Sequence, residues 1–140
     1  MRDQRFIAEH RGGPLTSNQH KALIQWAMIC AQHVLPLITD ELDDRIEGAV
    51  KTAEAWTIGE ASVGDAREAA KRLLTLAKEL SDETSVYVVR AFSHGVATAH
   101  MADHSLGLLY TLSGQLNQRI SLLLKKGNGK ILSYPLKLRN

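Results

Sequence analysis

The run Val86–Leu112, VYVVRAFSHGVATAHMADHSLGLLYTL, is the longest nearly charge-free stretch of the sequence. Upstream segments place apolar residues every three or four positions, which is the spacing of amphipathic helices that need an apolar surface to pack against. The start of the run is β-branched, but no second strand-like run exists to pair with it, and its alanine-rich continuation favours helix. We therefore expect the run to form the central helical segment, with Gly95 and Gly107 marking close helix packing or a break.

The sequence of 140 residues has the size of one domain and is rich in alanine and leucine, which favour helix. We predict an all-α, single-domain bundle of about five helices over residues 1–140, with a polar lead (1–15) and a short tail (127–140). The expected boundaries are a first cap at Thr16 or Ser17, ends at Pro36 and Gly59, a capping box at Ser62 and Asp65, and final helices to about Ala102 and from about His104 to Lys125. Trp26 and Trp56 are expected in the core.

Charge is distributed unevenly along the chain. Residues 40–83 hold 12 acidic and 6 basic side chains, whereas residues 105–140 hold no acidic and 6 basic ones. The acidic helices and the basic C-terminal segment could lie near each other or near a second copy of the chain. Alternatively, the basic segment could form a surface for an anionic partner, although its charges lack the interleaved aromatic residues typical of nucleic-acid binding.

Two features narrow the class of protein. The lone cysteine, Cys30, excludes an internal disulfide and a cysteine zinc cluster, and its apolar neighbours favour a core position. The N-terminal sequence is charged where a signal peptide would be apolar, and no apolar run reaches transmembrane length. We therefore expect a cytoplasmic protein with no membrane segment.

The most suggestive cluster of potential ligands is His100-Met-Ala-Asp-His104. On a continuous helix His100 and His104 would share one face with Asp103, and two imidazoles and a carboxylate can bind one transition-metal ion. His94 would need a bend to join them, and the glutamate of a zinc-protease helix is missing. The alternative is structural: partly buried histidines hydrogen-bonded to the backbone or to Asp103.

A second candidate is the loop His10-Arg11-Gly12-Gly13. Paired glycines beside basic residues can cradle a phosphate, but no strand precedes them and the P-loop pattern is absent. The alternative is a loop packed over the bundle. The sequence holds no nucleophile triad, no paired-carboxylate pattern and no dinucleotide fingerprint, so nothing argues for an enzyme, although none of this excludes one.

Four blocks of the sequence together point to a family. They are RDQRFIAEHRGGPLT, HKALIQWAMICAQHVLPL, AVKTAEAWTIGEASVGDAREAA and SHGVATAHMADHSLG, and they run from about Arg2 to about Leu112. In this order they resemble the helical putative immunity proteins of bacterial polymorphic toxin systems. The resemblance implies a small cytosolic all-α protein that binds and neutralises a cognate toxin domain, with no catalytic residues and no cofactor.

We expect toxin contacts on exposed features, such as the acidic helices or the basic tail. Two other functions remain open. One is a metal-dependent enzyme using His100, Asp103 and His104. The other is an oligomeric nucleic-acid accessory protein using the basic C-terminal segment, although nucleic acid is not the favoured partner. A homo-oligomer is compatible with the apolar residues of the tail.

Overall fold

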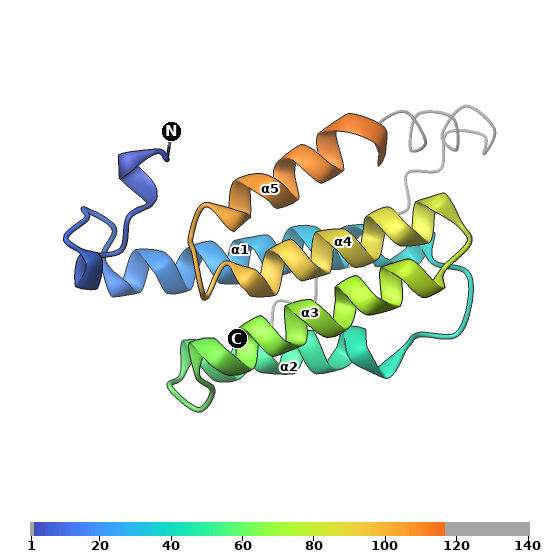
Figure 1. Cartoon of the computed structure of the whole chain (residues 1–140), viewed down its shortest axis with the longest axis horizontal. Coiled ribbons are helices and arrows are strands. Elements are labelled where there is room, and N and C mark those ends of the chain that lie inside the picture. Colours follow the sequence, from blue (N-terminus) through green and yellow to red (C-terminus); the bar gives the residue numbers. More distant parts are fainter. Residues whose placement is uncertain (1, 117–140) are drawn as a thin grey trace.

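The computed structural model describes residues 2–116 and confirms the all-α prediction for them. Five α-helices follow one another along this part of the chain: α1 (Ser17–Val34), α2 (Asp44–Thr57), α3 (Val63–Glu79), α4 (Glu83–Ala97) and α5 (His104–Thr111). Short 3₁₀ turns precede and follow α1, and a π turn at Leu112–Leu116 follows α5. Consecutive helices run in opposite directions (Figure 1). The predicted tail (127–140) lies outside the described residues.

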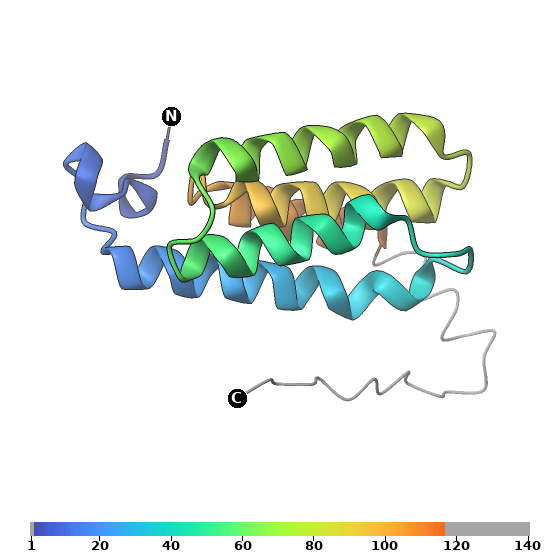
Figure 2. The ribbon, with the colours of Figure 1, turned by 90° about the horizontal axis from the view of Figure 1, so that it is seen from below.

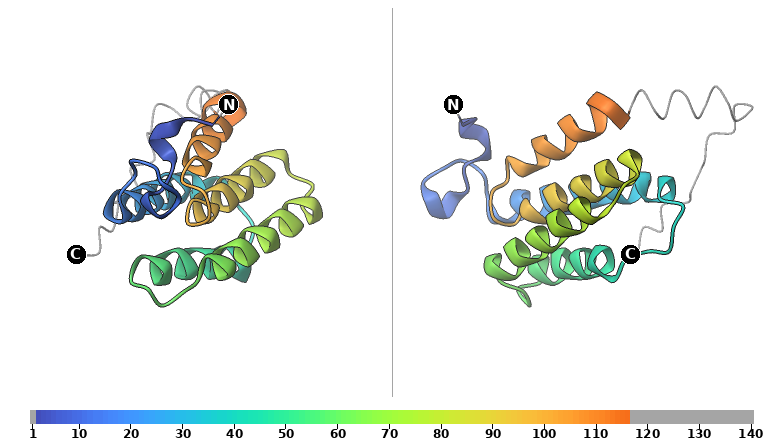
Figure 3. Two further views of the ribbon diagram at one scale, coloured as in Figure 1. Left: turned by 60° about the vertical axis from the view of Figure 1, so that its left-hand side comes forward. Right: turned by 45° about the vertical axis from the view of Figure 1, so that its right-hand side comes forward.

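Helix α4 is the centre of the bundle, as the apolar run predicted. It contacts all four other helices, and it lies between α5 and α3 in the ribbon views (Figures 1 and 3). From below, α2 lies between α1 and α3 (Figure 2). Five side chains of α4 have no exposed surface: Val88, Val89, Ala91, Phe92 and Val96. Their burial contributes to the hydrophobic stabilisation of this core.

The helix ends follow local chemistry that was visible in the sequence. Thr16 and Gln19 form a capping box at α1, and Ser62 and Asp65 form another at α3. At the end of α2, Gly59 adopts the left-handed conformation with φ +78°. The Gly59 and Glu60 amides donate to the last turn of the helix, in the pattern that lets a glycine close a helix.

Helix α4 is shorter than the sequence suggested: it ends at Ala97 rather than near Ala102. In a longer helix the Thr98 carbonyl would accept from the amide of Ala102. Here it accepts instead from His20 Nε2 on α1, at 2.5 Å. Residues 98–103 therefore form a tight turn, and α5 starts as a separate helix at His104.

The N-terminal lead packs against the bundle. Ala8 and Leu15 are buried and form an isolated bridge, in which the Glu9 amide donates to the Leu15 carbonyl at 2.8 Å. The lead therefore contributes buried apolar side chains, which its mainly polar composition did not indicate.

The two tryptophans, both expected in the core, differ in their burial. Trp56 is half-buried and packs edge-on against His20, with ring centroids 4.9 Å apart. Trp26 is not a core residue, because 40% of its surface is exposed. It lines an apolar groove of about 540 Å³ with Phe6, Leu23 and Leu106.

None of the helices within residues 2–116 is long and apolar enough to cross a membrane.

The close approach of α1 to α4 gives a test of the packing. A Cβ at Gly95 would lie 2.8 Å from the sulfur of the buried Met28, whereas a Cβ at Gly48 on α2 would meet nothing within 4 Å. Alanine is favoured over glycine in a helix by about 1 kcal/mol. We expect Gly48→Ala to raise the free energy of unfolding in urea. We expect Gly95→Ala to lower it by up to about 2 kcal/mol, because overpacking of the core costs about 1–3 kcal/mol and the alanine returns about 1 kcal/mol. Equal stabilisation by both substitutions would contradict the packing.

Candidate functional site

Three of the six histidines meet where α4 turns into α5. His94 lies on the last turns of α4, His100 lies in the connecting turn, and His104 is the first residue of α5. The ring centroid of His104 is 6.0 Å from that of His94 and 6.4 Å from that of His100. The spacing had suggested that His100 and His104 share one face of a helix. In the structure they do not, because the helix is broken between them. The break between the helices instead brings His94 into the cluster.

The imidazole of His94 packs against a glycine on the facing helix. A Cβ at Gly107 of α5 would lie 2.8 Å from His94 Nδ1, so only glycine leaves room for the imidazole at this crossing. The ring is half-buried. Burial lowers the pKa of His94, and the nearby His104 and Arg90 lower it further. The neutral imidazole is therefore the favoured form in the folded protein.

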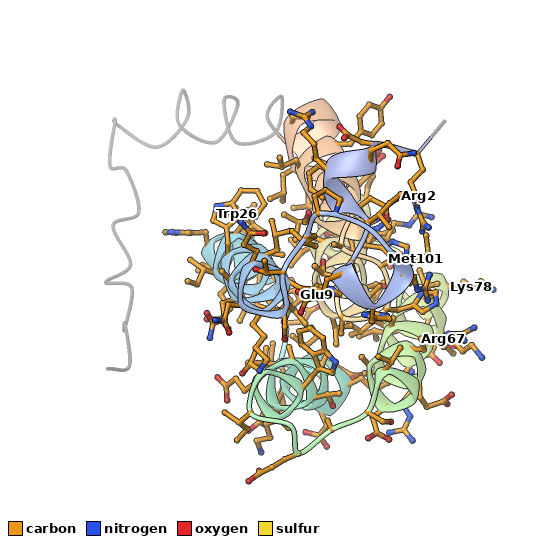
Figure 4. All side chains as sticks on the ribbon, turned by 90° about the vertical axis from the view of Figure 1, so that its left-hand side faces the viewer. Arg2, Glu9, Trp26, Arg67, Lys78 and Met101 are labelled. Carbon is orange, nitrogen blue, oxygen red and sulfur yellow. The ribbon has the colours of Figure 1, made fainter. Side chains whose placement is uncertain are left out.

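His100 lies among positive charges from three parts of the chain. Partial burial lowers the pKa of His100, followed by the charges of Arg67 on α3, Arg11 in the N-terminal lead, His104 and Arg2. Arg2, Arg67 and Met101 lie on one side of the bundle, as the end view shows (Figure 4). The turn after α4 is thus part of a cationic surface.

The predicted ligand Asp103 is engaged elsewhere. Its Oδ2 accepts from Arg2 Nε at 3.2 Å, in an ion pair that ties the N-terminal lead to the turn before α5. Among residues 2–116, no group of three His, Cys, Asp or Glu side chains is arranged to hold a metal ion. Binding of a transition metal by His100, Asp103 and His104 remains a prediction, and so does the enzyme that would use it.

The second candidate, His10 to Gly13, is a turn that satisfies its own backbone. The amides of Arg11 and Gly13 donate to the Ala8 carbonyl, and the amide of Gly12 donates to the Glu9 carbonyl. Gly12 has φ +81°, and a Cβ at Gly13 would overlap the Ile7 carbonyl. The two glycines allow the backbone conformation of the turn, and these amides donate to backbone carbonyls rather than to a ligand. His10 and Arg11 are exposed beside it.

The sequence reasoning missed His20. Its side chain is buried, donates from Nε2 to the Thr98 carbonyl, and stacks edge-on with Trp56. It lies four residues before Ile24 on the buried face of α1, so helical spacing would have identified its burial. All buried side-chain nitrogen and oxygen atoms in the described part of the chain have a hydrogen-bond partner.

The basic C-terminal segment, on which the nucleic-acid hypothesis depends, lies outside the described residues from Arg119 onward. That hypothesis remains a prediction.

Comparison with known proteins assigns the chain to a family. The model of the Imm-5 like putative immunity protein family matches residues 13–113, which span the end of the lead and all five α-helices. The protein therefore belongs to the Imm-5 like putative immunity protein family. No curated protein and no solved structure gives a significant match.

The lowered pKa of His94 predicts a pH-dependent stability. In the unfolded chain the imidazole takes up a proton near pH 6.5, whereas in the folded protein it does so only at lower pH. The unfolded state then binds more protons, so the free energy of unfolding should fall as pH falls from about 7.5 to about 5.5. We expect His94→Gln to reduce this slope in urea titrations and His33→Gln, at an exposed site on α1, to preserve it. An unchanged slope in His94→Gln would contradict the assignment.

Proposed function

We propose that this protein is an immunity-type inhibitor that binds a cognate toxin domain and neutralises it by covering its functional surface, without catalysis. The observation that carries the proposal is membership of the immunity family over residues 13–113. The match extends over the bundle as a whole rather than over one constellation of side chains. A conformationally fixed binding surface suits an inhibitor of this kind, because little order has to be gained on association.

The surface of the bundle supports this role. The outer face of α2 and the loop before it are acidic, with exposed carboxylates at Asp40, Glu41, Asp44, Glu47 and Glu54. Cationic side chains of the N-terminal lead and of α3 lie around His100. Faces of opposite charge give a protein fast and orientation-specific association with a partner of complementary charge.

Growth protection tests the proposal. A candidate toxin domain co-encoded with this chain would be expressed in cells with and without this protein, and the purified pair would be studied by titration calorimetry. We expect growth to be restored, and a stoichiometric complex with Kd on the order of 1 nM or below, because such pairs include the tightest protein complexes known.

The matched control is a toxin domain of an unrelated family, which this protein should neither bind nor neutralise. Absence of both binding and protection with the co-encoded toxin domain would refute the proposed function.

A further inference from the structure

Helix α3 separates its charges onto two flanks. Arg67, Lys71 and Lys78 recur at helical spacing on one flank, and Leu74 between them is 47% exposed. The other flank faces α2: there Glu79 accepts from Arg45 Nη2 of α2 at 2.6 Å. On that flank Glu68 also pairs with Arg72. Glu68 and Glu79 of α3 therefore form ion pairs within the protein, whereas the bases of the first flank face solvent.

The cationic flank of α3 continues across the bundle. Arg90 on α4 lowers the pKa of His94, and Arg67, Arg11 and Arg2 lower that of His100, so these charges lie close to the α4–α5 turn. In the end view Arg2, Met101, Lys78 and Arg67 all lie on one side of the bundle, with Trp26 on the opposite side (Figure 4). We call this surface the basic flank; it consists of Arg2, Arg11, Arg67, Lys71, Lys78, Arg90 and His100.

The charges of the basic flank are largely uncompensated. Asp103 pairs with Arg2. In the part of the chain that the structure describes, no carboxylate lies within ion-pair distance of Arg67, Lys71, Lys78 or Arg90. Like charges placed together without acids repel one another, and a partner that supplies carboxylates would relieve this repulsion.

Three possible occupants can be compared by their chemistry. The residues after 116 carry six basic and no acidic side chains, so the chain's own C-terminal segment has the wrong charge. A nucleic acid would find no Phe, Tyr or Trp side chain to stack on among the seven residues of the flank. A protein surface supplies both carboxylates for the cations and apolar atoms for the exposed Leu74 and the half-buried Met101.

We propose that the basic flank is the docking surface for an acidic, carboxylate-rich face of a partner protein. The identity of this partner rests on the proposed function, in which it is the toxin domain. Arg67 and Lys71 accelerate the encounter through their unpaired charges, and Leu74 and Met101 provide the apolar centre of the contact.

Two double variants test the surface with the same change in net charge. Arg67→Glu/Lys71→Glu reverses the basic flank, whereas Lys51→Glu/Arg72→Glu reverses two exposed cations beside the groove between α2 and α3. Binding of a fluorescein-labelled oligoglutamate peptide would be measured by anisotropy at two salt concentrations, with a duplex DNA oligonucleotide as the competing anion. We expect salt-sensitive peptide binding that weakens about tenfold or more in the first variant and less than about twofold in the second.

Several results would overturn the inference. They are absence of peptide binding by the wild-type protein, equal losses in both variants, or tighter binding of DNA than of peptide. Self-association of the wild-type protein that Arg67→Glu/Lys71→Glu abolishes would assign the flank to a second copy instead.

Growth protection separates this inference from the proposed function. If the wild-type protein and Arg67→Glu/Lys71→Glu protect cells equally, the toxin docks elsewhere and the function stands. If the wild-type protein fails to protect, the function is refuted, and the peptide experiment still decides whether the flank binds acidic protein surfaces.

Discussion

The burial of most of α4 against the four other helices is the constraint on which the rest of the structure depends. A helix enclosed by four others needs short side chains at the crossings and a partner for each buried polar group. Gly95 admits Met28 of α1, and Ser93 donates to the Ala70 carbonyl of α3 at 3.1 Å. The other helices can then keep their outer faces for charge, and α3 holds Arg67, Lys71 and Lys78 on a flank apart from its acids.

The end of α4 positions the histidine cluster. His20 takes the Thr98 carbonyl out of the helical pattern, the chain turns, and α5 returns along α1 and α4 with Gly107 against His94. The turn places His100 among the arginines of the lead and of α3, and Arg2 binds Asp103. The residues that first suggested a metal site thus form one edge of a cationic surface.

The sequence predicted the features that depend on local chemistry and apolar spacing. These include the central position of the 86–112 run, the cap at Ser62, the glycine at the end of α2 and the close packing at Gly95. It did not predict the end of α4 at Ala97, because that end depends on a hydrogen bond from His20, 78 positions away. The exposure of Trp26 was missed because helical spacing does not show which element covers a face. The charge separation on α3 follows from the same spacing, but its continuation to His100 required the tertiary structure.

The most direct measurement is NMR chemical-shift mapping of the isotope-labelled protein titrated with a toxin domain against which it protects cells. An inhibitor that docks through the basic flank should show its largest amide shifts around Arg67 and Lys71 of α3 and around His100. The amides of α2 near Lys51 should stay unchanged. Shifts centred on Trp26 and α5, or no shifts at stoichiometric toxin, would contradict this mode of recognition.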